Sequence, residues 1–160
     1  MWAALDTMPP GSGVLGRPDC PLPGTAKDMI PFPVDHVAVA VTSLEKASPT
    51  FQLLAGEPCS PVEELPAQGV RVCFAGSVEL LEPLGPSTTV GRFLDKRGQA
   101  LHHIAYRVPN LPQALARFKA EGFELIDEAP RPGARGHNVA FLNPRSTQGI
   151  LVELVEVQED

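Results

Sequence analysis

The chain has few cysteines and no long apolar run. Its three cysteines form no Cys-x-x-Cys pair, and an odd number leaves one thiol over in any disulfide scheme, so a reducing cytoplasm is favoured. No apolar run reaches the roughly 18 residues of a membrane-spanning helix. Residues 1–16 lack the basic start and apolar centre of a secretory signal. With 43% hydrophobic and 20% charged residues, the 160 residues predict one modest soluble domain with no membrane partner.

Basic residues are too few to make the chain positive overall. The net charge of −6 argues against nonspecific nucleic-acid binding, which usually needs a basic patch to displace counterions. The basic residues are unevenly placed, however, and nine of the 13 lie between positions 92 and 145. We therefore predict a local anion site. The nine are Arg92, Lys96, Arg97, Arg107, Arg117, Lys119, Arg131, Arg135 and Arg145.

Residues 1–33 differ in composition from the rest. They hold seven of the 18 prolines and show no sustained strand or helix period. Such a segment does not offset its ordering entropy by burial. We expect a disordered N-terminal extension, or a start codon assigned upstream of a true start at Met29, followed by one folded domain over 34–160.

Two stretches of the chain repeat one another. The run His36–Val41, HVAVAV, returns as His103–Val108, HIAYRV. The run Val78–Glu82, VELLE, returns as Val152–Glu156, VELVE, in the same order along the chain. This self-similarity indicates an internal duplication.

Each half is expected to fold as βαβββ, which gives an α+β protein, because strand alternation, helix caps and turn residues follow in the same order in both. The first module, about 34–85, is expected to hold strands at 34–41, 58–64, 69–75 and 77–82 and a helix from the Ser43 cap to about Ala55. The second, about 101–157, is expected to hold strands at 102–108, 123–128, 137–142 and 149–156 and a helix between Asn110 and Gly122. A short helix over 87–96 links the modules.

Strand alternation also predicts where the polar side chains point. His36 shares a strand face with two alanines, and His103 shares one with Ala105, so small neighbours leave room beside each histidine. Glu79 and Glu153 stand among apolar side chains, where an unpaired charge is costly and a bound cation would remove the cost. His102 is expected on the opposite face from His103, in a structural role. His137 is expected to be an ordinary residue at the edge of a turn.

Superposing the two repeats brings two histidines and two glutamates into symmetric positions. A single strand histidine is more often structural than a ligand, and a single strand glutamate is usually solvated. Their occurrence at equivalent positions of both repeats favours one shared four-ligand metal site between the halves. The four candidate ligands are His36, Glu79, His103 and Glu153.

The duplicated modules resemble the vicinal oxygen chelate superfamily, which includes glyoxalase I, extradiol dioxygenases, bleomycin-resistance proteins and methylmalonyl-CoA epimerase. The resemblance spans about 34–157 and is greatest to the epimerase branch. It rests on the runs Asp35–Val41, Glu79–Gly85, Phe93–Lys96, Leu101–Ala105, Asn143–Ser146 and Gly149–Leu154.

The resemblance implies a mixed sheet that curls around one divalent ion per chain, Co, Mn, Ni, Zn or Mg, bound by the four candidate ligands. It implies an epimerase that interconverts (2R)- and (2S)-methylmalonyl-CoA through an enolate, with Glu79 and Glu153 as the acid–base pair. A homodimer is expected. Because CoA thioesters are polyanionic, the expected substrate contacts are Lys96, Arg97 and Arg145.

The sequence also leaves alternatives open. Some epimerases that resemble this chain carry glutamine at the Glu79 position and use a glutamate on the preceding strand, where this chain has Val72. A glyoxalase I-like lyase would use the same four ligands on a glutathione hemithioacetal. An extradiol dioxygenase fits less well. The iron site of that class has two histidines and one carboxylate as ligands, whereas Glu79 supplies a fourth ligand here. A non-enzymatic drug-binding module of the bleomycin-resistance type resembles the topology but usually lacks the ligands.

Overall fold

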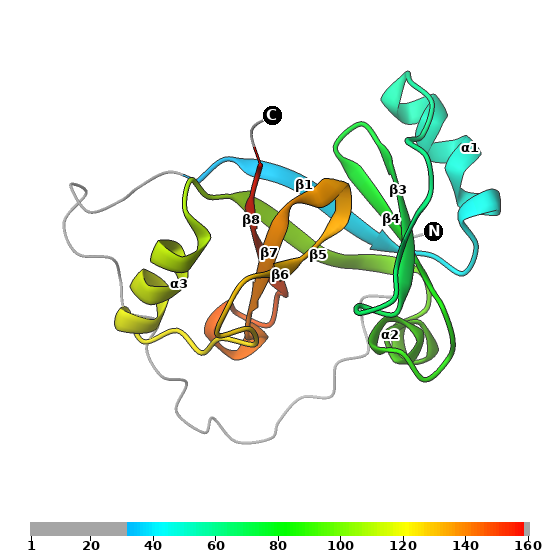
Figure 1. Ribbon diagram of the computed structural model, residues 1–160. Helices are drawn as coiled ribbons and strands as arrows, with labels where there is room; N and C mark the ends of the chain where they lie inside the picture. Colours follow the sequence, from blue (N-terminus) through cyan, green and yellow to red (C-terminus); the bar gives the residue numbers. More distant parts are fainter. Residues whose placement is uncertain (1–31, 159–160) are drawn as a thin grey trace.

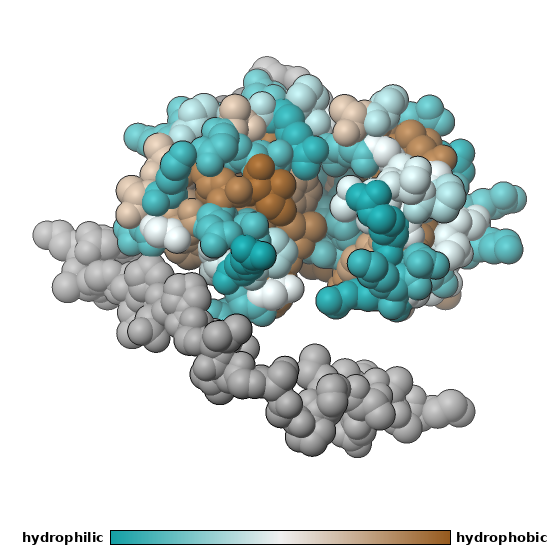
Figure 2. Space-filling model, turned by 90° about the horizontal axis from the view of Figure 1, so that it is seen from below, coloured by the Kyte–Doolittle hydropathy of each residue, from teal (hydrophilic) through white to brown (hydrophobic). Residues whose placement is uncertain are grey.

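The computed structural model describes residues 32–158 (Figure 1). The predicted extension over 1–33 therefore lies outside the described residues, apart from its last two. Within the described part, no helix is long and apolar enough to cross a membrane. Hydrophobic surface gathers toward the middle of the face shown in Figure 2, with hydrophilic side chains around it.

The order of the elements is βαβββ in each half, as predicted. The first module consists of β1 (Val34–Ala40), α1 (Leu44–Ala55), β2 (Glu63–Leu65), β3 (Val70–Ala75) and β4 (Val78–Pro83). The linking helix is α2 (Thr89–Arg97). The second module consists of β5 (Ala100–Arg107), α3 (Leu111–Ala120), β6 (Arg131–Pro132), β7 (Asn138–Leu142) and β8 (Val152–Glu156), with 3₁₀ turns η2 (Ala134–Gly136) and η3 (Pro144–Ser146).

All eight strands belong to one curled mixed sheet, in the order β2-β3-β4-β1-β5-β8-β7-β6. This order is symmetric about the antiparallel pair β1 and β5, which crosses the middle of the molecule (Figure 1). Within each module the first and last strands are parallel neighbours, β1 with β4 and β5 with β8. The four strands that carry the candidate ligands therefore lie side by side at the centre of the sheet.

Local capping explains where the helices begin and end. The Ser43 hydroxyl accepts a hydrogen bond from the Lys46 amide at 3.3 Å, and α1 ends at Gly56, whose φ of 73° suits glycine. The Asn110 side chain accepts from the Gln113 amide at 2.8 Å at the start of α3. Both caps were predicted from the sequence. Between the modules, α2 lies so close to the preceding turn that a Cβ on Gly91 would stand 2.4 Å from the Gly85 carbonyl oxygen.

Two predicted strands are wrong in extent or position. The segment 58–64 forms a strand only from Glu63 to Leu65, and 123–128 forms no strand but a single bridge between Leu125 and Leu142. The short strand β6 follows at 131–132 instead. Prolines interrupt the first segment, at 58 and 61, and flank or end the short strand β6, at 130 and 132. Since proline has no amide hydrogen to donate to a ladder, β2 begins only after Pro61 and β6 is only two residues long.

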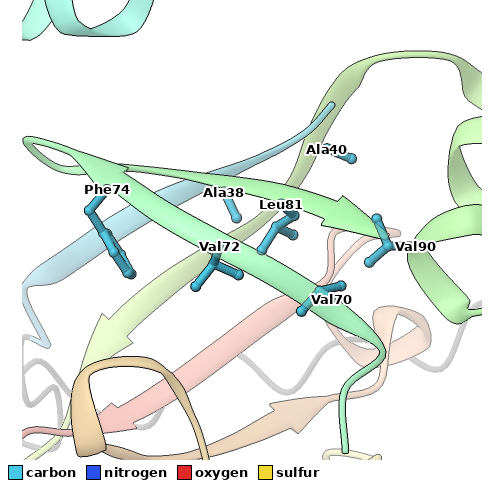
Figure 3. Packing of buried hydrophobic residues seen from close by; sticks show 7 residues of the cluster. All are labelled: Ala38, Ala40, Val70, Val72, Phe74, Leu81 and Val90. Carbon is cyan, nitrogen blue, oxygen red and sulfur yellow. The ribbon is translucent and has the colours of Figure 1, made fainter. Parts of the chain in front are cut away.

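The core is divided between the two faces of the sheet. On the outer face, the side chains of Val41, Leu44 and Leu80 are buried with partly buried residues of α1. On the inner face, one cluster combines small and large side chains from the first module and α2, shown in Figure 3. Its members are Ala38, Ala40, Val70, Val72, Phe74, Leu81 and Val90. The alternation predicted for the first strand is thus observed, with the alanines on the histidine side.

Candidate active site

Four buried polar side chains meet on the inner face of the four central strands. Ala38 lies opposite Glu79 on β4 and opposite His103 on β5. Ala105 lies opposite Glu153 on β8 and opposite His36 on β1. Both alanines are fully buried, at 0% exposure, and their small side chains leave the space into which the larger ones extend. The four polar residues, only 5–6% exposed, are His36, Glu79, His103 and Glu153.

The reactive atoms of these side chains converge on one point. Nε2 of His36 lies 3.3 Å from Oε2 of Glu79 and 3.2 Å from Oε2 of Glu153. Nε2 of His103 lies 3.6 Å and 3.3 Å from the same two oxygens. The structure therefore brings together all four residues that the repeats paired, one from each central strand.

The cluster has the character of a cation site. Ligand atoms of His36, Glu79 and His103 all lie within 4.8 Å of one another. Among the described residues, Nε2 of both histidines and Oε2 of Glu153 are buried without a hydrogen-bond partner. Buried polar atoms normally have such a partner, and atoms oriented in this way onto one point have the arrangement of cation ligands. Two imidazoles and two carboxylates fit a divalent metal, which would bind all four.

The charges inside the cluster are strongly coupled. Burial lowers the pKa of His36, but the contacts with Glu153 and Glu79 outweigh it and raise the pKa to about 10. Burial raises the pKa of Glu153, but its contacts with His103 and His36 bring the pKa down to about 2. An imidazolium at His36 therefore balances the carboxylates, and binding of a divalent cation would displace that proton.

A carboxylate behind His36 fixes the orientation of its ring. Asp35 Oδ2 lies 2.8 Å from His36 Nδ1, and the Asp35 side chain is only 3% exposed. Burial raises the pKa of Asp35, but hydrogen bonds from His36 and Arg107 lower it below its usual value, so the group stays charged. Carboxylate–histidine pairs of this kind hold the other ring nitrogen toward a metal.

His103 is supported by His102, which does not lie on the opposite face from His103 as predicted. His103 lies opposite Ala38 and Leu101 opposite Val39, so His102 is the extra residue of an irregularity of the β-bulge type. The bulge brings its ring to the cavity, with Nδ1 at 2.9 Å from Nδ1 of His103. Burial and the neighbouring His103 lower the pKa of His102 to about 4. The His102 ring is therefore neutral, and its Nδ1 is able to accept a hydrogen bond from Nδ1 of His103.

We expect His102→Phe to weaken the binding of a divalent metal by about tenfold or more, as outer-shell changes commonly do. Without an acceptor at His102, nothing holds the proton of His103 on Nδ1, and Nε2 is no longer kept free for a metal. His102→Asn, which retains an acceptor, should weaken binding less. Calorimetric titration of Co²⁺ into both variants measures the difference, and unchanged affinity in His102→Phe would contradict this role.

A cavity of about 310 Å³ opens over the cluster. Its walls are apolar in part, with Leu65, Val70 and Leu151 among them. Its arginines are Arg131 and Arg135, which the sequence analysis counted in the basic region without assigning them to the site. Arg131 lies in the two-residue strand β6 and Arg135 in the turn η2 that follows. Neither segment is long enough for a periodic pattern to mark a buried face, so only their position in the fold identifies them.

The three basic residues expected to contact substrate lie outside the lining of this cavity. Lys96 and Arg97 belong to the last turn of α2, and the Arg97 guanidinium lies 5.9 Å from the Phe93 ring. Arg145 lies in η3 of the second module. His137, expected as a turn residue, follows η2 and also lines the cavity.

A family model, relatives in sequence and solved structures all connect this chain with the same group of proteins. A family model described as the Glyoxalase/Bleomycin resistance protein/Dioxygenase superfamily matches residues 35–141. The uncharacterized protein YqjC of Bacillus subtilis (strain 168) is 41% identical over 131 residues, which cover 79% of this chain and 94% of YqjC. The mitochondrial methylmalonyl-CoA epimerase of Mus musculus is 37% identical over 126 residues, covering 76% of this chain and 71% of the mouse protein.

The similarity extends to solved structures. A methylmalonyl-CoA epimerase in complex with methylmalonyl-CoA and NH4+ superposes with a TM-score of 0.73. It is 28% identical to this chain, and the match covers 78% of this chain and 94% of that one. The curled sheet described above is therefore also the fold of this solved epimerase.

Proposed function

The chain belongs to the glyoxalase/bleomycin resistance protein/dioxygenase superfamily, and we propose that it is a metal-dependent epimerase that interconverts (2R)- and (2S)-methylmalonyl-CoA. The observation that carries the proposal is the convergence of two carboxylates and two imidazoles on one buried point, at 3.2–3.6 Å. The epimerase relatives support the choice of reaction within the superfamily. The cytoplasmic location and the homodimer expected from the sequence stay predictions.

The ligand set defines what a bound ion would contribute. His36, Glu79, His103 and Glu153 would hold one divalent ion, Co, Mn, Ni, Zn or Mg, which would stabilise the negative charge that develops on the substrate oxygens when the C2 proton leaves. The four side chains are only 5–6% exposed, so their charges act with less screening than on the surface.

Proton transfer is assigned to the two glutamates. They extend from strands related by the duplication, so they approach the same point from opposite modules. One glutamate, as the carboxylate, would take the proton as the C2–H bond breaks. The other, protonated beforehand as the carboxylic acid, would supply its proton to the opposite face as the new C2–H bond forms, so the two groups exchange protonation states. This exchange inverts the centre with no net change in protons. The low pKa of Glu153, about 2, means that this carboxylate is ionised before it takes a proton.

The surroundings of the cluster favour Glu79 and Glu153 over other acidic residues as the groups that transfer the proton. Val72, at the position where some similar epimerases have a base, is fully buried in the inner-face cluster. Two further acids line the cavity, and both are engaged in other contacts. Asp35 contacts His36 and two arginines, while Asp127 accepts from the Phe141 amide at 2.8 Å. The four-ligand cluster likewise disfavours a drug-binding module, because such modules usually lack these ligands.

The direct test is proton exchange at C2. Metal-loaded protein should interconvert the two methylmalonyl-CoA epimers and incorporate solvent deuterium at C2, observed by mass spectrometry. Protein treated with a chelator is the control and should lose this exchange, then regain it when a divalent ion is added. Absence of exchange, together with rapid turnover of a glutathione hemithioacetal, would assign the chain to glyoxalase I-like chemistry instead.

Lys96, Arg97 and Arg145 are proposed to attract the phosphates of CoA from outside the cavity. Because solvent-exposed charges are screened by salt, the Michaelis constant should rise with ionic strength. Charge reversal at Lys96 and Arg97 should raise it further, with turnover at saturation little changed. Steady-state kinetics of the double variant at two salt concentrations would reveal this, and an unchanged Michaelis constant would remove these residues from the substrate site.

A further inference from the structure

Two arginines of the second module frame the cluster of four candidate ligands in the same way, each packed against a phenylalanine ring of a different module. The Arg135 guanidinium lies 3.8 Å from the centre of the Phe74 ring, and that ring packs edge-on against His36 at 5.4 Å. The Arg131 guanidinium lies 5.1 Å from the centre of the Phe141 ring, which packs edge-on against His103 at 5.3 Å. Each cation is therefore separated from a candidate ligand by one aromatic ring.

The backbone fixes Arg135 over the first module. Its φ of 57° lies in the left-handed region that non-glycine residues rarely adopt. The Glu63 carboxylate on β2 accepts its amide hydrogen, with N–O distances of 3.0 and 3.3 Å. At the start of the turn, a Cβ on Gly133 would stand 2.6 Å from Val139, so the turn packs tightly on β7. A strained conformation held from both sides is typical of a residue placed for binding.

Neither guanidinium is saturated by its partners in the described chain. A guanidinium has five N–H donors. Arg135 donates one, through a terminal nitrogen, to Asp35 at 3.3 Å, whereas Arg107 donates two to the same carboxylate at 3.1 and 2.7 Å. The Nε of Arg131 is buried without a hydrogen-bond partner, although it lies 3.2 Å from Asp127. Donors thus remain for an anion in the cavity that both side chains line.

We propose that Arg135, with Arg131 beside it, binds the free carboxylate of the acyl group and so selects malonyl-type thioesters over simple acyl thioesters. The planar guanidinium fork matches a carboxylate in geometry and charge. The inference rests on the proposed function, because that reaction requires a carboxylate on the carbon that loses its proton. Arg135 is thus a specificity residue, and it takes no proton itself.

The test compares two ligands that differ at one group. Malonyl-CoA carries the carboxylate, and propionyl-CoA has a methyl group in its place. Calorimetric titration of the metal-loaded full chain should give Arg135→Gln an affinity for malonyl-CoA at least about tenfold lower than that of the unaltered protein, because charge-assisted hydrogen bonds are lost. Its affinity for propionyl-CoA should be unchanged. Glutamine meets the same backbone restriction as arginine at a φ of 57°, so the turn is matched.

Arg107→Gln is the control variant. Arg107 binds the same Asp35 carboxylate but does not line the cavity. An effect through Asp35 would act on both ligands alike, so the ratio of the malonyl-CoA to the propionyl-CoA affinity should stay unchanged in this variant. If Arg107→Gln reproduced the loss seen with Arg135→Gln, the effect would pass through Asp35 and His36, and the proposal would be overturned.

The remaining outcomes separate this inference from the proposed function. An equal loss for malonyl-CoA and propionyl-CoA in Arg135→Gln would assign Arg135 to the CoA phosphates and overturn the inference. No loss for either ligand would overturn it as well, while C2 exchange by the unaltered protein would leave the epimerase assignment standing. The converse outcome is that Arg135→Gln loses malonyl-CoA affinity selectively while the unaltered protein shows no C2 exchange. That result would support the carboxylate site and contradict the assignment as an epimerase.

Discussion

Replacing His103 or Glu153 with alanine should reduce the bound divalent metal from one equivalent to nearly none and abolish epimerisation. Each change removes one of four buried ligands and leaves the others as polar atoms facing a cavity. Since even outer-shell partners contribute about 10- to 100-fold to metal affinity, loss of a ligand should cost more than about 100-fold. Plasma mass spectrometry of gel-filtered protein measures the metal content.

The matched control is Glu156→Ala. Glu156 lies on the same strand as Glu153, three residues further on and on the opposite face, and it does not line the cavity. Its replacement should leave metal content and activity unchanged. A full equivalent of metal in purified His103→Ala or Glu153→Ala would show that these residues do not form the metal site.

Replacing Glu153 with glutamine should slow exchange of the C2 proton by about 100-fold or more, which is the usual contribution of a positioned acid or base. Binding of methylmalonyl-CoA should change much less, because the amide has nearly the same shape and keeps an oxygen for a metal. Deuterium incorporation followed by mass spectrometry gives the exchange rate, and calorimetry gives the affinity.

Comparison with Glu79→Gln sharpens this test. If the two carboxylates serve opposite faces of the substrate, one variant should lose exchange chiefly from the (2R) epimer and the other chiefly from the (2S) epimer. Glu156→Gln, on the opposite face of β8, should exchange both epimers normally. Normal exchange of both epimers in Glu153→Gln would exclude Glu153 as a proton carrier.

Local patterns in the sequence were sufficient to predict the modules and the candidate ligands. A duplicated run such as His36–Val41 is visible without coordinates, and strand alternation gives the face on which each side chain lies. The caps at Ser43 and Asn110 were likewise predictable, because a cap involves residues only three positions apart. These features depend on neighbours along the chain.

Features that depend on distant neighbours were decided by the tertiary structure. The bulge that turns His102 toward the cavity exists only in the pairing of β5 with β1, so alternation along one strand predicted the wrong face. Arg135 reaches the site because its turn is bound by Glu63, 72 residues earlier in the sequence. Its surroundings come from both modules, and no periodic pattern within its own segment contains that information. The sequence by itself therefore determined the four repeated side chains that form the site. The packing of one module against the other decided which further side chains, such as His102 and Arg135, lie beside them.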